Sequence, residues 1–247
     1  DQMGVLFNYL RDSGQLENTV IAVTSDHGDY MGDHWLGEKD LFHEPSVKVP
    51  LIIYDPSPNA DATRGTVCDA LVESIDLVPT FVEMAGGAPR DEYLEGRSLL
   101  PYLHGEAPEC WRDFVVSEYD YSMTAMAAKM GVDPKDARLF MLFDGRWKLT
   151  HAEGGMPPML FDLGSDPNEL VDLGRDPAYE EQRRVCYDRL GEWARRCAQR
   201  NTMSDEEIVS RRGKSRRKGI VLGMADPSAA DPELTVRYSG KTKQRFV

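Results

Sequence analysis

Asp26 and His27 are adjacent residues whose side chains could bind a metal ion, and they follow a short apolar run, Val20–Val23. This run is β-branched and bounded by polar residues, which predicts a strand buried on both faces of a sheet. Ligands of open α/β sheets bind outside the carboxyl ends of the strands. A carboxylate and an imidazole at this point are therefore candidate metal ligands, although Asp-His-Gly also occurs in ordinary turns.

The composition of the 247 residues is that of a globular protein, with 41% apolar and 9% aromatic residues. No apolar run approaches the length of about 18 residues that a membrane span needs, so we expect no membrane span. The chain begins at Asp1 without an initiator methionine, and we expect it to be a fragment.

The net charge of −13 is unevenly distributed, because residues 201–247 carry a net +4 and residues 1–200 carry −17. An acidic body argues against nucleic acid as a partner. The basic tail could bind a polyanion, embrace another subunit or be a solvated segment.

The four cysteines have neither CxxC pairing nor zinc-finger spacing. Cys186 and Cys197 are expected on one helix about 16 Å apart, which is too far for a disulfide. All four are expected to be free thiols, which favours a reducing compartment and a cytoplasmic location.

Hydrophobic periodicity and turn residues predict the elements that must position the Asp26–His27 pair. In the first 110 residues the pattern predicts helices over 1–13, 76–87 and 98–105 and strands over 19–25, 49–54 and 67–72. Beyond residue 110 the pattern predicts a small antiparallel sheet with strands at 114–119, 139–143, 147–151 and 159–162. Asp144-Gly145 favours a hairpin, and a helix over 178–200 is expected to cover the sheet.

Several ordered stretches carry a resemblance to a known family. They are Asn18–Gly28, Gly32–Lys39, Val49–Ile53, Ser74–Thr80, Gly96–Pro101, Trp147–Lys148 and Leu160–Glu169. In this order and spacing they resemble the C-terminal half of the sulfatase family, within the alkaline phosphatase-like superfamily. The chain is most similar to the branch of phosphonate monoester hydrolases and arylsulfatases.

The resemblance implies an α/β fold, in which part of a doubly wound mixed sheet is followed by a small antiparallel sheet packed by a C-terminal helix. Residues 1–110 are expected to belong to the α/β catalytic domain and residues 111–200 to a small α+β subdomain. Residues 201–247 are expected to form a basic, irregular tail, through which the protein could form a homo-oligomer.

The resemblance also assigns roles to site residues. It makes Asp26 and His27 two ligands of one divalent metal ion and Lys39 the contact to the anionic group of a small ester substrate. A metal ion and an ammonium group are the electrostatic clamp that cleavage of a sulfate or phosphonate ester requires. His43, and less so His34, is a tentative proton donor to the leaving oxygen. Imidazole suits Mn, Zn or Fe, and Ca stays open as an alternative.

The family's nucleophile motif, Cys/Ser-x-Pro-x-Arg, is absent from this chain. The resemblance places that motif and the other metal ligands in a missing N-terminal half of the same protein. We therefore expect the chain to be inactive alone. The alternatives are a phosphodiesterase or mutase-type phosphoryl-transfer relative and a non-catalytic sulfatase-like module.

Overall fold

The structure, a computed structural model, describes residues 2–197 and 203–211. The chain divides into two units, Asp1–Thr202 and Met203–Val247, and each is described by itself. The described part of the second unit contains helix α7 (Asp205–Arg211). Most of the basic tail lies outside the described residues, so its predicted role as an oligomer contact stays a prediction.

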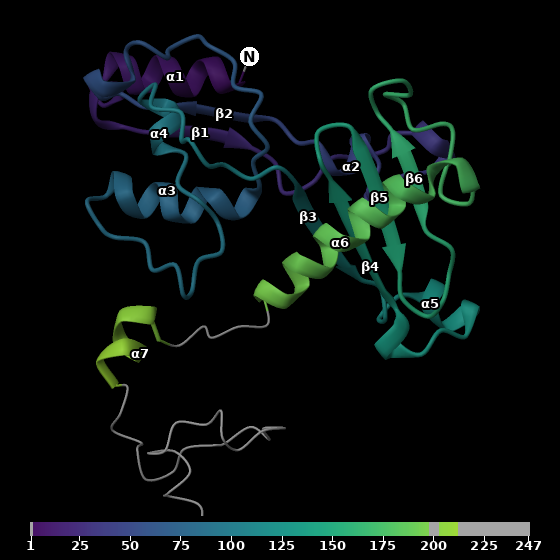
Figure 1. Ribbon diagram of the computed structural model, residues 1–247. Coiled ribbons are helices and arrows are strands. Elements are labelled where there is room, and N and C mark those ends of the chain that lie inside the picture. Colours follow the sequence, from purple (N-terminus) through teal and green to yellow (C-terminus); the bar gives the residue numbers. More distant parts are fainter. Residues whose placement is uncertain (1, 198–202, 212–247) are drawn as a thin grey trace, which may run out of the picture. The chain divides into compact units, whose positions relative to one another are not determined.

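The N-terminal part of the first unit combines short helices with a two-stranded sheet (Figure 1). Strands β1 (Ile21–Thr24) and β2 (Leu51–Tyr54) pair antiparallel, with Ile21 opposite Tyr54. The helices are α1 (Gln2–Asp12), α2 (Glu44–Val47), α3 (Leu77–Met84) and α4 (Leu100–Leu103). Short 3₁₀ turns lie at Leu16–Asn18, Asp33–Trp35, Pro58–Ala60, Ser74–Asp76, Pro134–Asp136 and Pro177–Tyr179.

The second half of the unit is built on a four-stranded antiparallel sheet in the order β3-β4-β5-β6, as predicted. Its strands are β3 (Val115–Asp120), β4 (Arg138–Phe143), β5 (Trp147–Ala152) and β6 (Met159–Asp162). The predicted hairpin joins β4 to β5, and Gly145 has the positive φ of 91° that this tight turn requires. Helix α5 (Ala125–Met130) lies in the connection between β3 and β4, and helix α6 (Glu180–Cys197) follows the sheet.

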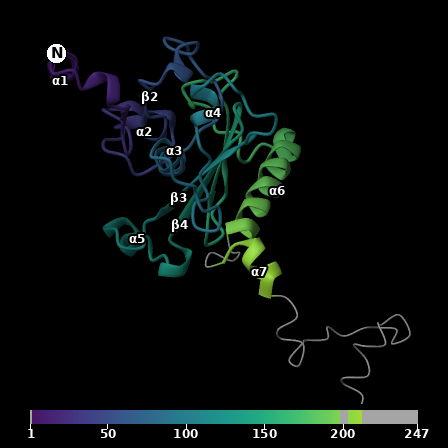
Figure 2. The ribbon, with the colours of Figure 1, turned by 90° about the vertical axis from the view of Figure 1, so that its left-hand side faces the viewer.

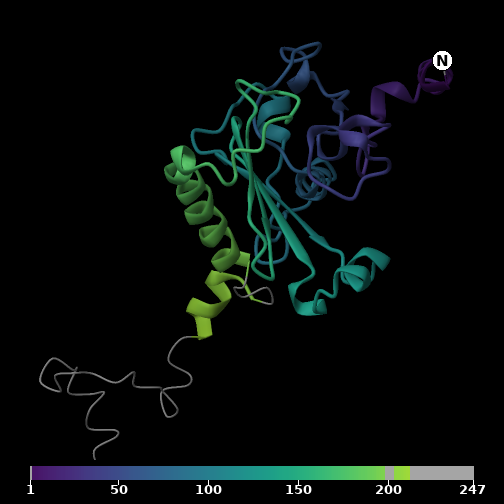
Figure 3. The ribbon, with the colours of Figure 1, turned by 90° about the vertical axis from the view of Figure 1, so that its right-hand side faces the viewer.

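The two faces of this sheet pack against different parts of the first unit. Leu142, Leu149 and Leu160 form one buried cluster with Cys186 and Leu190 of α6. Because side chains alternate along a strand, the neighbouring residues of β5 and β6 point to the opposite face. Figures 2 and 3 show α6 along one face and the N-terminal elements on the other. The sheet therefore packs its helix on one side and supports the Asp26–His27 region on the other.

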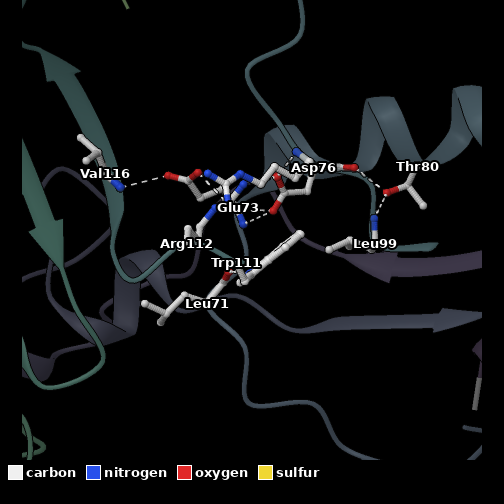
Figure 4. A network of polar contacts seen from close by, with 9 residues as sticks. Leu71, Glu73, Asp76, Thr80, Leu99, Trp111, Arg112 and Val116 are labelled. Carbon is white, nitrogen blue, oxygen red and sulfur yellow. Dashed lines mark hydrogen bonds and ion pairs between the residues drawn. The ribbon is translucent and has the colours of Figure 1, made fainter. Parts of the chain in front are cut away.

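Asp76 is a fully buried carboxylate that joins distant segments (Figure 4). Its oxygens lie 2.5 and 2.6 Å from the guanidinium of Arg112 and accept hydrogen bonds from the backbone N–H groups of Glu73 and Arg97. Asp76 also occupies the N-cap position of the following helix, α3. In the structure its side chain makes no cap to that helix, because the buried Arg112 and two backbone donors occupy it.

The same network joins two of the stretches that carry the resemblance, Ser74–Thr80 and Gly96–Pro101. Thr80 Oγ donates to the Asp76 carbonyl and accepts from Leu99 N–H, so the two stretches are fixed together. A Cβ at Gly96 would lie 2.1 Å from the Ile75 carbonyl oxygen, and only glycine allows this approach.

Two sequence expectations differ from the structure. The predicted strand over 67–72 is wrong, because the carbonyl of Leu71 accepts from the Trp111 indole N–H at 2.6 Å and no strand forms there. Strand β1 is only partly buried, because within the described residues it pairs with β2 alone.

Candidate metal and anion site

Asp26 and His27 directly follow strand β1, where the chain turns toward helix α2. Gly28 N–H donates to the Ser46 carbonyl at 2.7 Å, which fixes the end of the turn. A Cβ at Gly28 would lie 1.9 Å from the Pro45 carbonyl oxygen. This close approach explains why glycine follows the candidate ligands.

The imidazole of His27 has one ring nitrogen that can act as a metal ligand. Nδ1 lies 2.7 Å from the Gly28 carbonyl oxygen, which can only accept, so Nδ1 carries the proton of the neutral ring. Nε2 then presents its lone pair, and it lies 2.8 Å from Lys39 Nζ and 3.4 Å from Asp26 Oδ2. A backbone carbonyl on the second ring nitrogen is the usual arrangement for a metal-binding histidine.

Asp26 is an exposed carboxylate, with 83% of its side chain accessible. Its Oδ1 accepts the His27 backbone N–H at 3.0 Å. This hydrogen bond is the largest cause that lowers the pKa of Asp26 below its usual range, and the opposing effect of burial is smaller. The side chain is therefore ionised at neutral pH, as a metal ligand must be.

The donor set fits part of a divalent metal site. An oxygen and a nitrogen donor face each other at 3.4 Å, and both suit the transition metals that proteins bind. Among the described residues no group of three or more His, Cys, Asp or Glu side chains could hold a metal ion. Divalent ions take four or more ligands, so the pair fits as two members of a larger set.

An open cleft of about 1400 Å³ contains these groups. Asp26, His27 and Lys39 line it from one side, and Tyr119 of β3 lines it from the sheet. The Tyr119 hydroxyl also contacts Asp40, and burial followed by this charge raises the pKa of Tyr119. Three of the four residues to which we assigned a role thus share one cleft.

The structure places the fourth residue, His43, elsewhere. Its side chain is buried, does not line the cleft and lies against Phe161 of the sheet at a ring distance of 5.5 Å. Tyr30 Oη donates to His43 Nδ1 at 2.8 Å and accepts the His43 backbone N–H. Burial, then the His34 and Lys148 charges, lowers the pKa of His43 from 6.5 to about 4, so the ring is neutral. His34 stacks on it at 4.0 Å.

A buried cation to which no role was predicted from the sequence also lines the cleft. Lys148 of β5 is 1% exposed, and its Nζ lies 2.7 Å from Glu44 Oε1 and 2.8 Å from Glu169 Oε1. Its partners lie 104 and 21 residues away in the chain, so no local pattern could reveal the cluster. Alternation along β5 could have shown only that Lys148 faces away from α6.

Comparison with known proteins decides the family. Residues 32–196 match the family described as N-sulphoglucosamine sulphohydrolase, C-terminal. The chain belongs to the sulfatase family. It is 38% identical over 185 residues to the multifunctional alkaline phosphatase superfamily protein PehA of Trinickia caryophylli, covering 72% of this chain and 35% of that protein. It is 33% identical over 181 residues to an arylsulfatase of Clostridium perfringens, covering 73% and 34%.

Solved structures agree with the expected fold. The phosphonate monoester hydrolase of Agrobacterium radiobacter superposes with a TM-score of 0.72 at 32% identity and covers 79% of this chain and 38% of that one. The corresponding enzyme of Silicibacter pomeroyi gives a TM-score of 0.69 at 34% identity, with 78% and 38% covered. The family and the alkaline phosphatase-like α/β fold are thus confirmed.

This sulfatase-family chain spans about a third of the length of the relatives that it matches. Among the proteins that it matches are one named as an arylsulfatase and one named as a phosphonate monoester hydrolase. The boundaries at residues 110 and 200 and the roles of the four site residues stay predictions. No helix of the described residues is long and apolar enough to cross a membrane.

Proposed function

We propose that the protein to which this chain belongs hydrolyses sulfate esters or phosphonate or phosphate monoesters with the help of a divalent metal ion. The observation that carries the proposal is the convergence of Asp26, Lys39 and the Nε2 lone pair of His27 in one cleft of a sulfatase-family chain. An anionic ester needs positive charge around its reacting centre, and Lys39 together with a metal ion held by Asp26 and His27 would provide it.

Asp26 and His27 would hold the metal ion, whose identity among Mn, Zn, Fe and Ca stays open. When bound, the ion supplies Lewis-acid stabilisation of charge on the ester oxygens. Lys39 binds the anionic group as a point charge with three donors. Gly28 fixes the His27 ring through its carbonyl, so that Nδ1 keeps its proton and the Nε2 lone pair would be the donor to the ion.

The attacking group comes from outside this chain. None of the four cysteines is followed by the x-Pro-x-Arg of the family's nucleophile motif. Cys186 is buried against the sheet, and burial raises the pKa of its thiol to about 11, which makes it a poor nucleophile. We therefore propose that the isolated chain has no turnover.

The exposed apolar surface of α1 and β2 supports the proposal that the missing N-terminal half of the same protein is the partner of this chain. Helix α1 has no buried residue, and its apolar side chains Met3, Leu6 and Phe7 are exposed. Ile52 of β2 is 64% exposed, and within the described strands β1 and β2 each have one neighbour. Exposed apolar side chains beside open strand edges mark a surface that another segment covers.

His43 is not part of this proposal, because its ring is buried and does not line the cleft. Its role as a proton donor stays a prediction. The cytoplasmic location also stays a prediction. So does the homo-oligomer, since most of the tail that would carry the contact lies outside the described residues.

The test uses the full-length protein and two substrates, an aryl sulfate and an aryl phosphonate monoester. We expect turnover of at least one, and a loss of about 100-fold or more in kcat/KM for Lys39→Met. Lys129→Met on α5, which does not line the cleft, serves as the matched control. Full activity of Lys39→Met would reject the proposed role of the lysine. No hydrolysis of either ester, with metal bound, would favour the non-catalytic module.

A further inference from the structure

Ser46 connects the two segments that supply the charged groups of the cleft. It is 3% exposed and lies in helix α2. Its hydroxyl donates to the Lys39 carbonyl at 2.7 Å, and its own carbonyl accepts the Gly28 N–H at 2.7 Å. One residue therefore holds the backbone of the lysine and the backbone that follows His27.

The backbone that follows His27 is in close contact with helix α2. The backbone of Gly28 packs directly on the Pro45 carbonyl, where a Cβ would approach to 1.9 Å. The Gly28 carbonyl in turn orients the His27 ring through Nδ1. A shift of α2 would thus move the ring nitrogen that faces Asp26 and Lys39.

Helix α2 is itself anchored to the four-stranded sheet. Glu44, its first residue, donates its backbone N–H to Glu169 Oε2 at 2.6 Å and pairs with Lys148 through its carboxylate at 2.7 Å. Lys148 also pairs with Glu169 at 2.8 Å, and both side chains are buried. Buried, charge-assisted hydrogen bonds of this kind have little freedom to rearrange.

The Lys39 side chain cannot fix its own position. It is a flexible four-carbon stem whose ammonium lies in the cleft, 2.8 Å from His27 Nε2. Its reach is set by the backbone from which it starts, and Ser46 holds that backbone.

We propose that Ser46 is a positioning residue that holds the Lys39 backbone against the loop of His27, so that the Lys39 ammonium can bind the anionic ester. This inference rests on the proposed function, because it assigns to Ser46 an effect that acts through Lys39. Loss of the hydroxyl leaves the partly buried Lys39 carbonyl without its donor and releases the backbone that carries the ammonium.

The test is a double-mutant cycle in the full-length protein, with Ser46→Ala, Lys39→Met and both changes together. We expect Ser46→Ala to lower kcat/KM for an aryl sulfate or phosphonate monoester about 10-fold, and to cause no further loss in the Lys39→Met background. Competitive inhibition by inorganic phosphate is expected to weaken in parallel, and again only when Lys39 is present.

Thr80→Val is the matched control, because Thr80 is also buried and its hydroxyl bonds two backbone groups that lie away from Lys39 and His27. Any effect of this change should be the same with and without Lys39. If Ser46→Ala prevents folding, Ser46→Cys, which keeps a weaker donor, replaces it in the cycle.

Equal losses from the Ser46 change in both backgrounds, or no loss at all, would overturn the proposal while leaving the proposed function intact. Full activity of Lys39→Met would instead reject the lysine's role and this inference with it.

Discussion

The ammonium of Lys39 lies 2.8 Å from Nε2 of His27 and occupies the lone pair that a metal ion would take. Asp26 Oδ2 lies 3.4 Å from the same nitrogen. An ammonium group and a divalent cation repel each other and cannot share one lone pair. When metal binds, Lys39 must therefore leave His27, and the anionic group of the ester is the partner that its charge requires.

This competition predicts opposite effects of Lys39→Met on two measurements. Removing the ammonium removes a competitor for His27, so the affinity for Mn²⁺ or Zn²⁺ should stay the same or rise while turnover falls. Titration calorimetry on the metal-free full-length protein measures the affinity, and His27→Ala is the comparison that should weaken it. A loss of metal affinity in Lys39→Met would mean that the lysine supports the metal site directly.

His43 predicts a dependence of stability on pH. Its folded-state pKa, about 4, lies below the ordinary 6.5 because the ring is buried beside His34 and Lys148. Between these values the unfolded chain binds a proton that the folded chain does not, so stability is lost as pH falls from about 6.5 to 4. At about 1.4 kcal/mol per pKa unit the loss reaches about 3 kcal/mol. Unfolding of the full-length protein in urea at several pH values measures it.

His43→Gln tests the same group. Glutamine can accept from Tyr30 Oη but does not titrate, so the slope of stability between pH 4 and 6.5 should flatten. A variant with wild-type stability at neutral pH but greatly reduced turnover would support the predicted proton-donor role instead.

The buried cluster of Lys148, Glu44 and Glu169 predicts a large effect of one lysine on stability. Lys148→Met leaves the carboxylates of Glu44 and Glu169 without their cation, which should cost about 3–5 kcal/mol of the free energy of unfolding. Lys148→Met combined with Glu169→Gln removes one unpaired charge and should recover part of that loss. Lys48→Met, at an exposed pair with Glu44, should change stability by less than about 1 kcal/mol. Equal effects of the two lysine changes would contradict the cluster's importance.

Two glycines of the same loop are expected to respond differently to alanine. Gly28→Ala places a Cβ against the Pro45 carbonyl and must displace α2, so stability and anion binding should both fall. Gly37→Ala meets no atom within 4 Å and should be tolerated. Thermal unfolding and inhibition by inorganic phosphate measure the two properties. A tolerated Gly28→Ala would show that α2 is free to move.

The elements that sequence predicted best are those with a local cause. Asp144-Gly145 produces the β4–β5 hairpin because the turn needs a positive φ, and the stripe with Cys186 and Leu190 produces α6. The predicted strand over 67–72 is wrong because an apolar run becomes a strand only when another strand pairs with it. Here the indole of Trp111, 40 residues away, takes the Leu71 carbonyl.

The site residues also differ in whether a local pattern marks them. Asp26, His27 and Lys39 could be named as candidates because they lie within one loop and match the family's motif. Ser46 was not among the candidates, and Lys148 appeared only in the matching stretch Trp147–Lys148, with no role assigned to it. The importance of both residues depends on contacts that sequence patterns do not encode. A serine seven residues after the lysine is unremarkable until its hydroxyl is seen on the Lys39 carbonyl. A strand lysine becomes significant only when two glutamates from other segments surround it.

The metal content of the full-length protein, measured by elemental analysis after extensive dialysis, tests the central claim most directly. We predict about one divalent ion per chain in the wild-type protein and a large loss of it in Asp26→Ala and His27→Ala, while the Asp29→Ala control keeps it. Wild-type protein without bound metal after supplementation with Mn²⁺, Zn²⁺, Fe²⁺ and Ca²⁺, or an Asp26→Ala variant that retains a full ion, would contradict the account.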